Sequence, residues 1–115
     1  MPLAPVPVPQ RLQGRSVVVT GAGTGFGAEI AVRAAQEGAR TVGVHYRSSV
    51  EGAKRTADRV TAAGSTPVLL QADIVDWEQI KAVADAAFDR LDGVDVLVNN
   101  VGDVAREQMR SKAHV

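Results

Sequence analysis

Four glycines recur at alternate positions in the segment Thr20-Gly21-Ala22-Gly23-Thr24-Gly25-Phe26-Gly27. The apolar run Val17-Val18-Val19 precedes this segment, and a segment that reads as a helix, Ala28 to Glu37, follows it. Glycine permits positive φ and carries no Cβ, so the backbone of such a turn can approach a ligand closely. The first N–H groups of a helix have no partner inside the helix, and the helix dipole adds partial positive charge there. The pattern therefore favours binding of a pyrophosphate group.

The run Gly23-x-Gly25-x-x-Ala28 also fits the loose G-x-G-x-x-G/A fingerprint of dinucleotide sites. This fingerprint is weak alone, because a glycine-rich turn can simply let a helix pack closely against a strand. The context separates the two interpretations, since a strand precedes the turn, a helix follows it, and a second strand and helix come close behind. We therefore expect a dinucleotide ligand.

Alternating apolar patterns position this turn within a larger fold. One helix is expected directly after the turn, a second from Ser48 to Gly64 and a third from Asp76 to Gly93. In the third helix apolar residues recur at helical spacing from Ile80 to Leu91. Ser48 with Glu51, and Asp76 with Gln79, have the spacing of capping boxes, and glycines 38, 64 and 93 are natural helix ends. Strands are expected at 16–20, 41–46, 67–70 and 94–98. The order β-α-β-α-β-α-β predicts an α/β fold, an incomplete Rossmann-type parallel sheet with helices on both faces.

The carboxyl ends of the four expected strands carry polar or glycine-rich segments. These are the glycine turn and the segments 45–47, 71–73 and 99–102. Ligands of open parallel sheets bind beyond the carboxyl ends of the strands. We therefore expect the four segments to form one binding crevice.

Composition excludes several classes of function. The formal net charge is zero and 23% of the residues are charged, which gives no sign of a nucleic-acid or membrane partner. The chain has no cysteine, so disulfides, thiol catalysis and cysteine-based metal sites are excluded, and we expect no metal. Prolines 2, 5, 7 and 9 predict a disordered tail over residues 1–13, ahead of a partial dinucleotide-binding domain over 14–115. The expected location is the cytoplasm.

Three motifs in order resemble those of the short-chain dehydrogenase/reductase family. They are Thr20-Gly21-x-x-x-Gly25-x-Gly27, then Asp73 after the third strand, then Asn99-Asn100-x-Gly102 after the fourth. The family pattern ends in N-N-A-G, so Val101 stands in place of the usual alanine. The resemblance extends over most of the chain, from Leu12 to Gly102, and implies an oxidoreductase that transfers hydride between a nicotinamide cofactor and a carbonyl or hydroxyl substrate.

The resemblance also implies roles for individual residues. Glycines of the turn would lie under the pyrophosphate, Asp73 with Ile74 would contact the adenine, and the segment from Asn99 would contact the adenosine ribose. Two alternatives remain open: Asp73 as a turn residue at the entry of a helix, and the asparagines as caps of neighbouring backbone. The cofactor-binding residues expected in these three segments are Gly21, Gly23, Thr24, Gly25, Phe26, Gly27, Asp73, Ile74, Asn99, Asn100, Val101 and Gly102.

The end of the second strand bears on the choice of cofactor. An NAD site usually carries an acidic residue there, whereas an arginine suits the 2′-phosphate of NADP. The sequence reads Tyr46-Arg47-Ser48 and has no carboxylate before Glu51. Arg47 is suited to a charge-assisted contact with phosphate, and the alternative is a solvated loop residue. NADP is therefore favoured over NAD, and Tyr46 and Ser48 are expected to bind the cofactor together with Arg47.

The sequence lacks the family's catalytic pattern. Tyr46 is the only tyrosine, and Val50 stands where Y-x-x-x-K requires lysine. We therefore expect no catalytic residue in this chain, which would be a truncated cofactor-binding portion that is inactive alone. We also expect the chain to self-associate through the open edge of its fourth strand. The alternatives are a non-catalytic dinucleotide-binding or partner-completing module, and an interaction protein that acts through its proline-rich tail.

Overall fold

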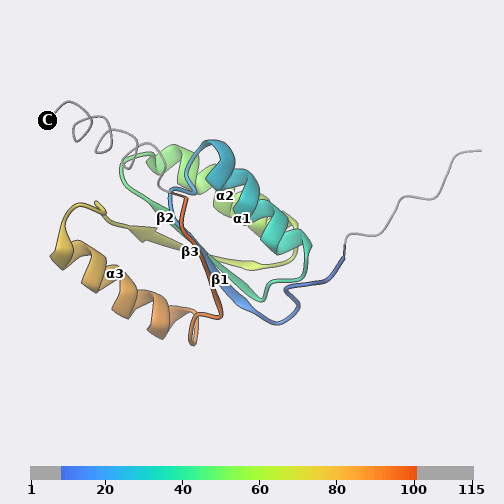
Figure 1. Cartoon of the computed structure of the whole chain (residues 1–115). Helices are drawn as coiled ribbons and strands as arrows, with labels where there is room; N and C mark the ends of the chain where they lie inside the picture. The colour runs from blue at the N-terminus through green and yellow to red at the C-terminus, as the bar shows by residue number, and fades with distance from the viewer. Residues whose placement is uncertain (1–8, 101–115) are drawn as a thin grey trace, which may run out of the picture.

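The computed structural model describes residues 9–100. Its four strands form one parallel sheet in the order β3-β2-β1-β4. Helices α1 and α2 lie on one face of the sheet and α3 lies on the other (Figure 1). The predicted Rossmann-type α/β fold is confirmed. The elements are β1 (Ser16–Val19), α1 (Gly25–Gln36), β2 (Thr41–Tyr46), α2 (Val50–Ala62), β3 (Thr66–Gln71), α3 (Trp77–Arg90) and β4 (Val96–Val98).

The strand order places a topological switch point beside β1. The chain steps from β1 to β2 to β3 in one direction, and α3 then carries it back to β4 on the other side of β1. Val19, the last residue of β1, pairs with Val98, the last residue of β4, so these two strands end level with one another, whereas β2 continues two residues past Val44, the partner of Val19, to Tyr46. Crevices outside the carboxyl ends of strands at such a point are where open α/β sheets bind ligands.

Apolar side chains from alternate strand positions form two cores. The larger core lies under α1 and α2, and the smaller core lies under α3 and includes Ala87 and Leu91 of that helix region. Such alternation follows from the pleat of a strand, which sends successive side chains to opposite faces. Buried residues of the larger core are Val17, Val19, Ala22, Ala31, Ala34, Ala35, Ala39, Val42, Val44, Ala53 and Val60, and the smaller adds Val18, Val68 and Leu70.

Several expected boundaries shift. Helix α1 begins at Gly25 rather than Ala28, so the second half of the glycine turn is already helical. Strand β3 begins at Thr66, and Pro67 is accommodated because β3 is an edge strand of the described sheet. Strand β4 is shorter than expected and begins at Val96. Just before it, the carboxylate of Asp95 accepts a hydrogen bond from the backbone N–H of Ser16 at 2.8 Å.

One of the two expected capping boxes is wrong. The N-cap of α2 is Ser49 rather than Ser48, and its side chain makes no capping hydrogen bond. At α3 the carboxylate of Asp76 accepts hydrogen bonds from the backbone N–H groups of Glu78 and Gln79, as expected. The glycines expected at the helix ends, 38, 64 and 93, all have positive φ, which confirms those ends.

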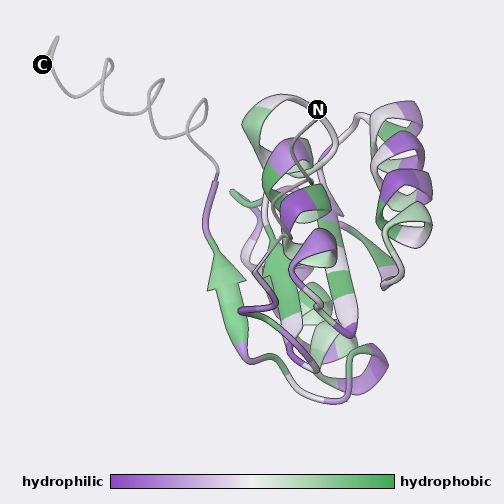
Figure 2. Cartoon of the chain, turned by 90° about the vertical axis from the view of Figure 1, so that its right-hand side faces the viewer, coloured by the Kyte–Doolittle hydropathy of each residue, from purple (hydrophilic) through white to green (hydrophobic). Residues whose placement is uncertain are grey.

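The two ends of the described segment differ in packing. Leu12, which the sequence places in the N-terminal tail, packs against the larger core, and its N–H donates to the carbonyl oxygen of Glu37 at 3.0 Å. Strand β4 is apolar along its length (Figure 2), yet Leu97 is 64% exposed. The rest of the predicted tail, residues 1–8, lies outside the described residues.

Candidate cofactor-binding site

The glycine turn presents an uncapped helix end. Gly21 and Gly25 have φ of 62° and 60°, which a side chain would disfavour. Thr24 is the N-cap of α1 but its side chain makes no capping hydrogen bond, and the first turn holds no acidic residue. Phe26 is 84% exposed, so its side chain does not cover the backbone there. The first N–H groups and the positive end of the dipole are thus left for an anion.

The turn also packs closely against the end of β4. A Cβ on Gly21 would lie 2.7 Å from the carbonyl oxygen of Asn100, and one on Gly27 would lie 2.6 Å from the Asn100 side-chain nitrogen and still nearer the carbonyl of Gly21. Both positions therefore exclude a side chain. The packing role that the sequence left open for these glycines is present, and it is what brings Asn100 to the turn.

Thr20 ties the same two segments by hydrogen bonds. Its hydroxyl oxygen accepts from the backbone N–H of Asn100 at 2.7 Å, and its hydroxyl lies 3.2 Å from the side-chain oxygen of Asn99, to which it can donate. Its own N–H donates to Val98 at 3.0 Å. The asparagine segment is thereby fixed beside the glycine turn by the hydroxyl and the backbone N–H of Thr20.

Helix α2 supports the outer side of the turn. The side chain of Thr56 lies 2.9 Å from the carbonyl oxygen of Ala22 and 3.1 Å from that of Gly52. Gly52 faces the carbonyl of Gly23, where a Cβ would overlap it. Sequence reasoning missed Gly52 and Thr56, although two small residues four positions apart on a helix are a signal of close packing.

A buried histidine supports the inner side. His45 is 4% exposed, and its Nδ1 accepts the N–H of Gly21 at 3.0 Å. Its Nε2 lies 3.0 Å from the carbonyl oxygen of Ala72 and donates to it. Burial lowers the pKa of His45, and the hydrogen bond to Ala72 opposes this only in part. In the sequence His45 stands at the end of an expected strand, and no local pattern indicates a role for it.

The residues expected to select the cofactor lie at the surface. Tyr46 is half-buried, and a Cβ added to Gly23 would lie 3.4 Å from the Cβ of Tyr46. Arg47 and Ser48 are exposed, and the carbonyl oxygen of Arg47 accepts from Gln71 at 3.2 Å. Within residues 9–100, the guanidinium of Arg47 has no ion pair or hydrogen bond, so it is free to meet an anion.

Asp73 has the local contacts of a turn residue. Its carboxylate accepts from the N–H of Val75 at 3.2 Å, and its own N–H donates to the side chain of Gln79 at 2.8 Å. The turn alternative is therefore present, and contact of Asp73 with an adenine stays a prediction. Val101 and Gly102 lie outside the described residues.

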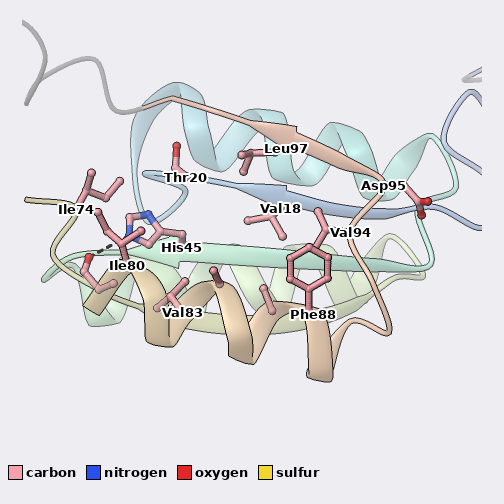
Figure 3. A pocket seen from close by; sticks show the side chains of 13 residues that line it. Val18, Thr20, His45, Ile74, Ile80, Val83, Phe88, Val94, Asp95 and Leu97 are labelled. Carbon is pink, nitrogen blue, oxygen red and sulfur yellow. Dashed lines mark hydrogen bonds between the residues drawn. The ribbon is translucent and has the colours of Figure 1, made fainter. Parts of the chain in front are cut away.

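Ile74 lines an apolar cavity of about 450 Å³ between α3 and the sheet. Figure 3 shows Ile80, Val83 and Phe88 of α3 facing this cavity, with His45 at one end. The apolar face predicted for α3 is thus only partly covered, and Phe88 is 60% exposed. Helical periodicity identified this face, but how far the sheet covers it depends on the tertiary packing of α3.

Neither a metal centre nor a membrane span is found in residues 9–100. No three side chains of histidine, aspartate or glutamate are grouped there so as to hold a metal ion. No helix in the same range has both the length and the apolar character needed to cross a bilayer.

The chain is similar in sequence and in structure to known dehydrogenases and reductases. A short chain dehydrogenase of Claviceps purpurea is 39% identical over 98 residues, which are 85% of this chain and 37% of that protein. A dehydrogenase structure from Burkholderia cenocepacia with bound NADP has a TM-score of 0.75 at 31% identity, over 79% of this chain and 35% of that one. An NADH-dependent reductase, A1-R′, complexed with NAD has a TM-score of 0.72 at 28% identity, over 79% and 37%.

The chain spans about a third of the length of the curated relatives it matches. The pattern of the short chain dehydrogenase family matches residues 15–114, which include the glycine turn and both strand-end motifs. The chain therefore belongs to the short chain dehydrogenase family.

Proposed function

We propose that this chain is the dinucleotide-binding portion of a short-chain oxidoreductase, which transfers hydride between a nicotinamide cofactor and a carbonyl or hydroxyl substrate. The observation that supports this most is the uncapped, acid-free N-terminus of α1 at the switch point between β1 and β4. A pyrophosphate fits this end, because it accepts hydrogen bonds from the free N–H groups and neutralises the dipole.

Each strand end has a part in the proposed complex. The turn from Gly21 to Gly27 binds the pyrophosphate, Asp73 and Ile74 contact the adenine, and the segment 99–102 contacts the ribose. When bound, the nicotinamide supplies or accepts the hydride. In this proposal the chain binds and orients the dinucleotide, and the family's Y-x-x-x-K pattern does not occur among its residues.

Arg47 selects NADP in this proposal. Its exposed guanidinium is unpaired within residues 9–100 and stands at the end of β2, where the adenosine ribose of a bound dinucleotide would lie. We expect Arg47→Ala to weaken NADPH binding about 10-fold, because a charge-assisted hydrogen bond is lost. NADH binding should change by less than about twofold. Titration of both cofactors by nicotinamide fluorescence measures the difference.

Arg33→Ala is the matched control for the loss of one positive charge. Arg33 is an exposed arginine paired with Glu37 near the end of α1, away from the turn. The control should leave both affinities unchanged. Equal weakening of NADPH and NADH by Arg47→Ala would contradict the selection of NADP, and absence of saturable binding by the unmodified chain would contradict the proposed function.

A second role for the surface of β4 is proposed alongside. Leu97 is exposed on an apolar strand, and within the described sheet β4 pairs only with β1. Zero net charge gives no repulsion between copies. We propose that β4 pairs with a second copy of this chain. The cytoplasmic location expected from the sequence stays a prediction.

A further inference from the structure

One buried ring joins two segments of the proposed site. His45 lies on β2, the strand between β1 and β3 in the sheet. Its ring accepts from Gly21 in the glycine turn and reaches Ala72, which precedes the expected adenine contact at Asp73. The ring therefore connects the pyrophosphate side of the proposed site to the adenine side. In the sequence His45 is 24 positions from Gly21 and 27 positions from Ala72.

The two contacts require one protonation state. The backbone N–H of Gly21 is a donor and needs an acceptor, whereas the carbonyl oxygen of Ala72 needs a donor. Only the neutral ring with its proton on Nε2 satisfies both. A second proton on Nδ1 would place two donors against each other, so the contact with Gly21 would be lost and the turn would have to move.

The surroundings disfavour that second proton. Apolar or neutral side chains line the cavity beside the ring from β1, from the segment after β3 and from α3. Asp95, the other titratable side chain of the cavity, lies at its far end (Figure 3). Within residues 9–100 no carboxylate forms an ion pair with the ring, and that of Asp73 accepts from Val75. These cavity-lining residues are Val18, Thr20, Ala72, Ile74, Ile80 and Val83.

We propose that His45 is a positioning residue of the dinucleotide site, which holds the glycine turn in its binding conformation when neutral and releases it when protonated. The proposal rests on the proposed function and adds to it a regulation by acid. Bound dinucleotide requires the turn to present its N–H groups in one arrangement, so affinity follows the fraction of neutral ring.

The direction of the pH effect follows from the sign of the shift. Burial lowers the pKa of His45 in the folded chain below its ordinary value of about 6.5. Above that value the ring is neutral, and the contact with Gly21 is fully formed. Affinity for dinucleotide is therefore constant at neutral and alkaline pH and falls as pH drops through the lowered pKa. We expect about a 10-fold loss of affinity once the ring is protonated.

The experiment measures the affinity of the full chain for NADP⁺ by calorimetry between pH 8 and pH 5, with the fold followed by circular dichroism. His45→Asn is the main variant, because its side-chain oxygen can accept from Gly21 but the amide does not titrate. It should bind within about threefold of the unmodified chain at pH 8 and lose the acid dependence that His45 adds. His45→Leu should weaken binding about 10-fold throughout, since the N–H of Gly21 is left without a partner.

Two controls isolate the ring. The 2′-phosphate of NADP⁺ also titrates near pH 6, but its contribution is common to all variants and cancels in the comparison. His114 is the chain's other histidine, so His114→Asn should keep the pH profile of the unmodified chain. An identical pH profile in the unmodified chain and His45→Asn would overturn the inference. Absence of binding at pH 8 would overturn the proposed function, and the inference with it.

A measurement without cofactor tests the geometry directly. Long-range ¹H–¹⁵N spectra of the cofactor-free chain should report the Nε2–H tautomer of His45 at pH 8, and the Gly21 amide resonance should titrate together with that ring. The opposite tautomer, or a Gly21 amide that ignores the titration, would overturn the inference even if the cofactor binds.

Discussion

At the scale of single residues, the glycine turn serves packing and binding at once. Gly27 does not have positive φ, so its requirement is for space rather than for conformation. Gly27→Ala would press a methyl group against the Gly21 carbonyl and the side chain of Asn100. We expect it to destabilise the chain by about 1–3 kcal/mol and to abolish saturable NADPH binding, measured by urea unfolding and fluorescence titration.

Gly64→Ala is the control at this scale. Gly64 has φ of 102° but open space around it, and it ends α2 away from the turn. Alanine there should cost about 1 kcal/mol of stability through backbone strain and leave NADPH affinity unchanged. If Gly27→Ala and Gly64→Ala had the same effect on binding, the close approach at Gly27 would have no bearing on the site.

At the scale of elements, α3 depends on its cap. Among the residues of the helix only Ala87 is buried, so packing contributes less here than at α1. Asp76 satisfies two N–H groups at the N-terminus of α3. Asp76→Ala should therefore lower the free energy of unfolding by about 1 kcal/mol, as measured by urea denaturation.

Ser49→Ala provides the comparison for the cap, because Ser49 is the N-cap of α2 and its side chain makes no capping hydrogen bond. Its substitution should change the free energy of unfolding by less than about 0.5 kcal/mol. A loss as large at Ser49 as at Asp76 would mean that the hydrogen bonds to Asp76 do not determine the stability of α3.

At the scale of the whole molecule, an apolar strand and a cavity lie on the side of the sheet that α3 covers only in part. If copies pair through β4, Leu97→Lys should shift the chain toward monomer by placing like charges opposite each other. Sedimentation velocity at several concentrations would measure this. Val75→Lys adds the same charge at a residue 62% exposed in the segment before α3, and should leave association unchanged. A chain that is monomeric at tens of micromolar, about a usual working concentration, would contradict pairing.

Much of the architecture was predictable because its signals are local. The strand, turn and helix order, the glycine helix ends and the cap at Asp76 each depend on residues within a few positions of one another. The capping box expected at Ser48 was wrong, because the N-cap position of α2 is Ser49 and its side chain makes no capping hydrogen bond.

The sequence by itself determined which residues form the glycine turn and which segments follow the strands, since periodicity and turn chemistry are properties of short stretches. Only the tertiary structure decided that His45 bridges Gly21 and Ala72, and that Asn100 lies against Gly27. It also decided that α3 leaves a cavity beside β4. These outcomes depend on contacts between residues tens of positions apart, whose distances are set by how helices pack on the sheet and not by any local pattern.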